Sequence, residues 1–257
     1  MVGFSLRKFK FARLIYFFLF LMLTACNSQP DKETIAESNL NDCVILLHGL
    51  ARTSRAMHKL EVALEPNYQV VNLTYPSKEH TVEKLSTLTI PTVLKACKTT
   101  GKIHFVTHSM GGIIVRQYLS QHWIENIGRV VMLGPPNQGS ELTDYFYNNW
   151  LYRKINGPAG LQLGTKNNNE QTSVPINLEG VNFNLGVIAG TKSYNPFFSK
   201  LLVGKDDGKV SVERTKVSGM NDHLVLPVNH TFMMQDSIVI DQVKHYLQHS
   251  KFKRPSV

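Results

Sequence analysis

The stretch Lys102-Ile103-His104-Phe105-Val106-Thr107-His108-Ser109-Met110-Gly111-Gly112 decides the fold. Its first six residues are rich in apolar side chains, as in a buried strand, and Gly111–His122 has helical spacing. Ser109 therefore falls on a sharp strand-to-helix turn, where a serine side chain is exposed above a sheet and can act as a nucleophile. The neighbours two residues away must be small, because the two backbones approach closely there. Gly111 meets this requirement, whereas Thr107 fits more tightly.

Strand and helix signals alternate on both sides of this turn. Apolar runs predict four further strands, at Cys43–Leu47, Tyr68–Leu73, Gly128–Leu133 and Leu185–Ala189. Helical spacing predicts three further helices, at Arg55–Leu64, Thr81–Cys97 and Gln235–His249. We expect Pro91 to kink or split the helix in which it lies. The alternation predicts an α/β domain with a mostly parallel central sheet and helices on both faces.

Residues 140–183 interrupt this alternation. They begin with a cluster of aromatic residues, namely Tyr145, Phe146, Tyr147 and Trp150, and continue into a polar, Asn-rich section. A long insertion of this kind in a compact domain predicts a cap or lid that lines a pocket above Ser109. The alternative is a surface excursion whose aromatic side chains pack on the core.

Composition sets limits on the class of protein. The chain has 257 residues, with 42% hydrophobic and 18% charged residues, which is typical of one globular α/β domain after an export signal. The net charge of +9 comes largely from the two ends of the chain. No basic stripe interleaved with aromatic residues is present, so nucleic acid is not expected as a partner. No Cys/His spacing suggests a metal site, and no cofactor is expected.

The N-terminus resembles a lipoprotein export signal. Basic residues precede the apolar run Leu14–Leu23, which is shorter than the roughly 20 residues that span a bilayer. The following Leu23-Thr24-Ala25-Cys26 resembles the lipobox of bacterial lipoproteins, in which the cysteine becomes the lipidated first residue. An ordinary signal peptide or an uncleaved anchor is the alternative.

This resemblance gives the predicted organisation of the chain. Residues 1–25 are the signal peptide, 26–40 a flexible tether, 41–250 the α/β domain and 251–257 a basic tail. The membrane is expected as a partner through lipidated Cys26. Because Asn27 is not the Asp of an inner-membrane retention signal, we expect the bacterial outer membrane, facing the periplasm.

Two cysteines remain in the predicted domain. Export places Cys43 and Cys97 in an oxidising compartment, so a disulfide between them is predicted. The alternative is a pair of buried free thiols.

Four sequence features together resemble the α/β-hydrolase superfamily, particularly bacterial lipases and esterases. They are LLHGL at 46–50, THSMGG at 107–112, the Asp207-Gly208 loop and a late histidine. The similarity extends over residues 43–249 and implies the α/β-hydrolase fold. Two departures stand out: Thr107 replaces the usual glycine, and no strand precedes Cys43.

The superfamily order is nucleophile, acid, histidine. For the acid it favours Asp207, which directly precedes Gly208, over Asp206, Asp144 and Asp222. For the base it favours His230, in a turn-like stretch before the last helix, over His223. The backbone N–H groups of Leu50 and Met110 correspond to the oxyanion hole.

The resemblance implies a serine hydrolase that cleaves carboxylic esters through an acyl-enzyme, with an ester or lipid as substrate. An acyltransferase or thioesterase that uses the same triad on lipid-linked acyl groups is the first alternative. A non-catalytic envelope lipoprotein that uses the fold for binding is the second. The oligomeric state is not predicted.

Overall fold

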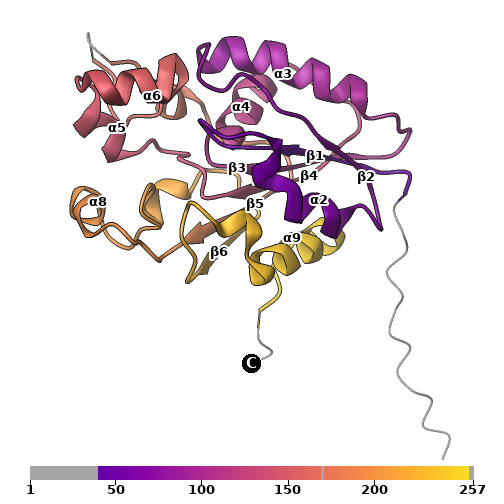
Figure 1. Cartoon of the computed structure of the whole chain (residues 1–257). Coiled ribbons are helices and arrows are strands. Elements are labelled where there is room, and N and C mark those ends of the chain that lie inside the picture. Colours follow the sequence, from indigo (N-terminus) through magenta and orange to yellow (C-terminus); the bar gives the residue numbers. More distant parts are fainter. Residues whose placement is uncertain (1–39, 169–170, 255–257) are drawn as a thin grey trace, which may run out of the picture. The chain divides into compact units, whose positions relative to one another are not determined.

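The computed structural model describes residues 40–168 and 171–254. Six parallel strands form one sheet in the order β2-β1-β3-β4-β5-β6 (Figure 1). Their bounds are β1 Cys43–Leu47, β2 Gln69–Asn72, β3 Ile103–His108, β4 Ile127–Leu133, β5 Leu185–Gly190 and β6 Asp222–Leu226. The chain order reverses between β1 and β3, which in open α/β sheets is where ligands bind beyond the carboxyl ends of the strands.

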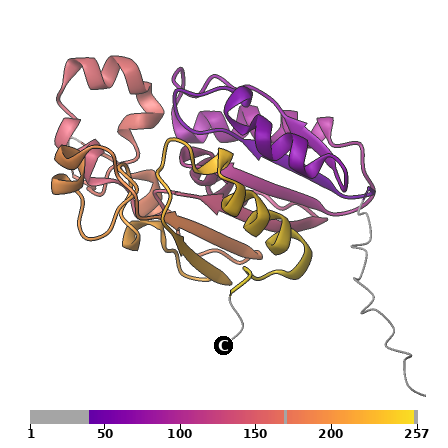
Figure 2. The same cartoon turned by 60° about the horizontal axis from the view of Figure 1, so that its bottom comes forward.

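Helices cover both faces of the sheet, because the central strands are apolar on both sides. On β1, Cys43, Ile45 and Leu47 pack into one core cluster with α3 and α4, whereas Val44 and Leu46 pack into the other with α2 and α9. Figure 2 shows α9 lying across the second face. These helices are α2 His58–Leu64, α3 Val82–Ala96, α4 Met110–Leu119 and α9 Ser237–His249. The predicted mostly parallel α/β sheet is confirmed.

Two local expectations differ from the structure. Strand β6 is absent from the predicted set because it is a short edge strand that begins with Asp222 and His223 and is only partly buried. Helix α3 runs unbroken through Pro91, so the expected split is wrong. Pro91 lies on the exposed side of α3, where the carbonyl that loses its partner can bond to water.

The inserted segment folds into three helices between β4 and β5. They are α5 Glu141–Phe146, α6 Trp150–Leu161 and α7 Val174–Asn177. The side chains of Ser140, Asn149 and Ser173 accept hydrogen bonds from the first turns of these helices. Helix α8, Pro196–Leu201, follows β5 and meets α5 through aromatic contacts of Phe197 and Phe198.

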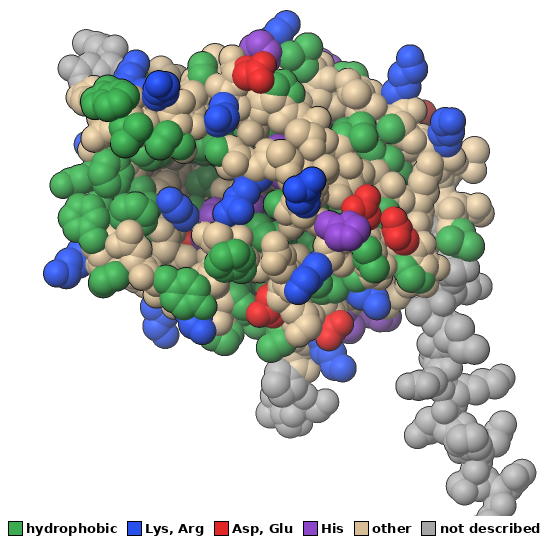
Figure 3. All heavy atoms as spheres, viewed as in Figure 1, with side chains coloured by type: hydrophobic (Ala, Val, Ile, Leu, Met, Phe, Trp, Pro, Cys, Tyr) green, Lys and Arg blue, Asp and Glu red, His purple; other side chains and the backbone are tan. Residues whose placement is uncertain are grey.

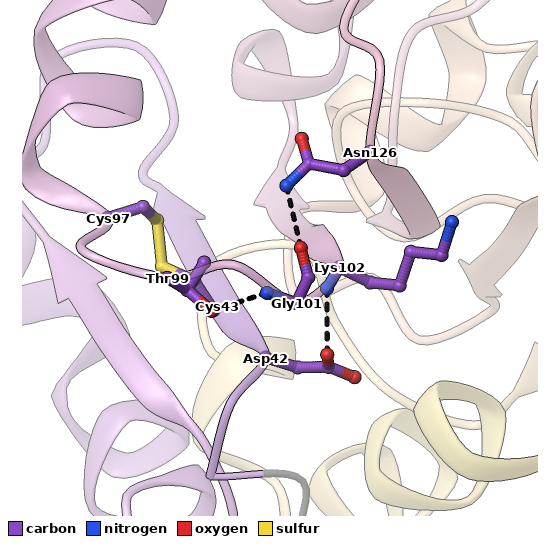
Figure 4. Close-up of a disulfide and its surroundings, with 7 residues drawn as sticks. All are labelled: Asp42, Cys43, Cys97, Thr99, Gly101, Lys102 and Asn126. Atoms are coloured by element: carbon purple, nitrogen blue, oxygen red, sulfur yellow. Dashed lines mark hydrogen bonds between the residues drawn. A yellow bond between two sulfur atoms is a disulfide. The ribbon is translucent and has the colours of Figure 1, made fainter.

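A disulfide joins Cys43, at the start of β1, to Cys97, directly after α3 (Figure 4). The two Cα atoms lie 5.9 Å apart. Beside it, the Asp42 carboxylate accepts from the Lys102 N–H, and the Asn126 side chain donates to the Gly101 carbonyl. These contacts hold together the end of the sheet at which the strands begin, opposite their carboxyl ends.

Among the helices of residues 40–168 and 171–254, none is both long and apolar enough to cross a membrane. The predicted signal peptide at 1–25 and Cys26 lie outside the described residues, and so does most of the 26–40 tether.

Candidate active site

Ser109 stands at the turn between β3 and α4 in a strained conformation. Its φ and ψ are 54° and −123°, in a region that residues other than glycine rarely occupy. The turn is sharp because α4 starts directly against β1: a Cβ on Gly111 would lie 2.7 Å from the Leu47 carbonyl oxygen. Thr107 fits because Gly112, whose Cβ would lie 3.2 Å from the Thr107 hydroxyl, has no side chain. The unusual Thr107 is therefore compatible with the sharp turn.

The structure brings Ser109, His230 and Asp207 together in one hydrogen-bonded chain. The His230 Nδ1–H donates to Asp207 Oδ2 over 2.8 Å, and Nε2 lies 2.9 Å from the Ser109 Oγ. The carboxylate of Asp207 can only accept, which assigns the Nδ1–H tautomer and leaves Nε2 as the acceptor for the serine proton. The Asp207 side chain is fully buried, so water does not compete for this contact.

The other candidates for the acid and the base form hydrogen bonds elsewhere in the structure. Asp206 accepts from the Ser199 hydroxyl and from the Gly208 N–H, which matches a local capping role. Asp144 accepts from Thr165 and Gln171 inside the cap. The remaining pair lies at β6, where His223 bonds to the Thr215 hydroxyl and Asp222 to Arg254.

His108 is a site residue that sequence reasoning missed. Its Nε2–H donates to the backbone carbonyl of His230 over 2.9 Å, and the two rings lie 4.8 Å apart. Burial above all, and then the charge of His230, hold the pKa of His108 well below 6.5. His108 is therefore neutral and fixes the backbone that carries His230. Its position next to the serine was the only signal in the sequence.

The loop after β1 presents Leu50 beside Ser109. A Cβ on Gly49 would lie 3.1 Å from the Ser109 Cβ, so this loop passes directly against the turn. The His48 ring stacks on Tyr75 at 4.1 Å, donates to the Gly49 carbonyl and accepts from the Tyr75 N–H. The Tyr75 hydroxyl donates back to the His48 carbonyl over 2.5 Å. Burial lowers the pKa of His48, so the ring stays neutral and the loop stays fixed.

Met110 is the second residue predicted for the oxyanion hole. It is the first residue of α4, so its N–H has no acceptor within the helix. With Leu50 on the adjoining loop, two backbone donors flank the serine from two different elements.

Ser109 opens into a pocket of about 650 Å³. Both the turn at Ser109 and the cap line it, the cap through Leu142, Phe146, Leu151, Tyr152, Ile155 and Leu163. Figure 3 shows hydrophobic side chains gathered over α5, α6 and α8, next to a hollow edged by Lys or Arg and His side chains. The prediction that residues 140–183 line the pocket of Ser109 is confirmed.

A second hollow, of about 730 Å³, lies around Arg116, Gln121 and Asn177, and neither Ser109 nor His230 lines it. Within residues 40–168 and 171–254, no group of three His, Cys, Asp or Glu side chains could hold a metal ion.

The sequence profile of the alpha/beta hydrolase fold matches residues 42–175, just over half of the chain. No curated protein has a matching sequence.

Solved structures share the fold at low sequence identity. The mature form of the Bacillus licheniformis lipase BlEst2 has a TM-score of 0.62 and 18% identity, covering 81% of this chain and 93% of that chain. The esterase RhEst1 from Rhodococcus sp. ECU1013 has a TM-score of 0.55 and 14% identity, with 81% and 91% covered. The Pyrococcus furiosus esterase Pf2001 has a TM-score of 0.52 and 20% identity, with 82% and 83% covered. At such identities the likeness concerns the fold.

Proposed function

Because the chain belongs to the alpha/beta hydrolase fold family, we propose that it is a serine hydrolase that cleaves carboxylic esters. The observation that carries the proposal is the chain of hydrogen bonds from Asp207 through His230 to Ser109, the last two of which line a largely apolar pocket. The named activities of the structural neighbours, lipase and esterase, agree with it.

The mechanism follows from the positions of the protons. His230 Nε2 takes the proton of Ser109 as Oγ attacks the ester carbonyl, and Asp207 stabilises the imidazolium that forms. The N–H groups of Leu50 and Met110 stabilise the oxyanion. His230 then protonates the leaving alcohol, and water attacks the resulting acyl-enzyme with His230 again as the base.

The pocket suggests which part of the ester it binds. Apolar cap side chains, among them Leu142, Leu151 and Ile155, line it on one side and suit an acyl chain. A fatty acyl ester therefore fits better than an acetyl ester, because each buried methylene contributes about 0.8 kcal/mol.

We further propose that the enzyme is held on the bacterial outer membrane, facing the periplasm, through lipidated Cys26. This proposal rests on Leu23-Thr24-Ala25-Cys26 alone. Several acyl chains on one cysteine would anchor the domain stably.

A panel of p-nitrophenyl esters from acetyl to palmitoyl tests the proposed activity, with the purified protein and its Ser109→Ala variant. We expect ester cleavage that rises from short to medium acyl chains and falls by at least about 10³ in the variant. Product analysis with added alcohol separates hydrolysis from acyl transfer. Equal rates for both proteins would overturn the proposal.

A further inference from the structure

The charges in the pocket of Ser109 are of one sign. Two cationic side chains line it, Arg52 and Lys209, and no Asp or Glu is among the lining residues. Arg52 lies two residues beyond Leu50, and Lys209 lies two residues beyond Asp207. Each cation thus belongs to a loop that also carries part of the catalytic apparatus.

Neither cation forms an ion pair with another of the described residues. Among the described residues, Arg52 has no hydrogen bond or ion pair, and the Lys209 ammonium has only the ring of Phe198, 4.8 Å away. The nearby carboxylate of Asp207 already accepts from His230 and from the N–H groups of Lys209 and Val210. By contrast, Arg214 at the base of the cap pairs with Glu141.

The two cations also act on each other. Burial lowers the pKa of Lys209, the Asp207 carboxylate opposes this shift, and the charge of Arg52 adds to it. Arg52 and Lys209 are therefore within Coulombic reach of each other, although the Asp207 carboxylate also acts on Lys209. An anion bound between them would remove their mutual repulsion and gain charge-assisted hydrogen bonds.

We propose that the preferred substrate is a fatty acyl ester whose alcohol moiety carries a phosphate, bound by Arg52 and Lys209. The acyl chain lies along the apolar side chains of the cap, and the phosphate lies at the two loops beside His230. His230 protonates the leaving oxygen, so the alcohol moiety of the ester lies on the His230 side of the site. Lys209 lies on the loop of Asp207, which holds His230, and we therefore place the phosphate on the alcohol moiety. This inference rests on the proposed ester hydrolysis and names its substrate class.

A matched pair of substrates tests the proposal: 1-decanoylglycerol 3-phosphate and 1-decanoylglycerol, both below their aggregation concentrations. They share the acyl chain and the scissile ester, so the ratio of their kcat/KM values isolates the phosphate. We expect the wild type to favour the phosphate ester about tenfold, from two partly exposed charge contacts of about threefold each.

The variants then assign this preference to the two side chains. Arg52→Gln and Lys209→Gln should each lower the ratio about threefold, and the double variant should bring it near one. Lys95→Gln removes an exposed cation at the far end of α3 and should leave the ratio unchanged. High salt should lower the ratio for the wild type but not for the double variant, which a purely structural effect would not produce.

A binding measurement keeps the test independent of catalysis. The ether analogues 1-decylglycerol 3-phosphate and 1-decylglycerol are titrated calorimetrically into Ser109→Ala, with and without the two Gln substitutions. Tighter binding of the phosphate compound, lost with the substitutions, supports the proposal. Equal binding of both compounds, or a kinetic ratio that the double variant leaves unchanged, overturns it. Cleavage of neither ester together with phosphate-selective binding would instead refute the ester hydrolysis.

Discussion

Asp207→Asn tests the assignment of the acid, because the surrounding hydrogen bonds dictate how the new amide must lie. Asp207 Oδ1 accepts from the backbone N–H groups of Lys209 and Val210, and Oδ2 accepts from His230 Nδ1–H. In the variant, the amide oxygen stays with the two backbone donors, so the NH₂ group faces Nδ1. His230 must then take the Nε2–H tautomer, which cannot accept the proton of Ser109.

The expected loss in kcat is about 10⁴, or about 5 kcal/mol of transition-state stabilisation, as for the corresponding change in a serine protease. The side chain is fully buried, so water cannot replace the lost acceptor. Steady-state hydrolysis of a p-nitrophenyl ester measures kcat, and thermal unfolding checks that the fold is retained.

Asp206→Asn is the matched control, since within the described part of the chain that side chain bonds only to Ser199 and Gly208. It should stay within about tenfold of the wild type. Wild-type kcat in Asp207→Asn, or a collapse of kcat in Asp206→Asn, would refute the reasoning.

Further predictions concern other parts of the molecule. His108→Ala should lower kcat about tenfold or more with little change in KM, because it frees the His230 backbone, and His108→Gln should restore much of the activity through its amide donor; equal kcat for the two variants would contradict this role. Since burial chiefly lowers the pKa of His108, its stabilising contribution is complete above about pH 6.5 and is lost as the pH falls below that value. Urea unfolding of His108→Gln should therefore show a weaker pH dependence than that of the wild type. Replacing Cys43 and Cys97 by Ser should lower the free energy of unfolding by about 4 kcal/mol, from a closed loop of 54 residues, and reductant should then have no further effect in urea unfolding. Mass spectrometry of the mature protein should find an acylated Cys26, and Cys26→Ala should release the protein from membranes; an unmodified N-terminus in a host that processes lipoproteins would refute the anchor.

The central fold could be predicted from sequence because its signals are local. β1 is a continuous apolar run, and a strand, Ser109 and a glycine-rich helix start occur in direct succession. β6 could not be predicted, because Asp222 and His223 give its first half a polar character that only an edge position in the sheet explains. The split expected at Pro91 is wrong, because the effect of Pro91 on α3 depends on which side of the helix faces solvent.

Part of the candidate site was also predictable from the sequence. Ser109, Asp207 and His230 follow the superfamily order of nucleophile, acid and histidine, and Gly208 distinguishes Asp207 from Asp206. His108 could not be assigned, because its partner is the carbonyl of a residue 122 positions away. Arg52 and Lys209 are ordinary loop cations in the sequence, and only the folded chain places both at one pocket.

Covalent labelling measures the central claim most directly. The purified protein is treated with a fluorophosphonate, which phosphonylates an activated serine, and the adduct is located by peptide mass spectrometry. The Asp207–His230–Ser109 chain predicts a single stoichiometric adduct on Ser109, absent from Ser109→Ala and strongly slowed in Asp207→Asn. An unlabelled Ser109 in the folded protein, or an equally fast adduct on another residue, would contradict it.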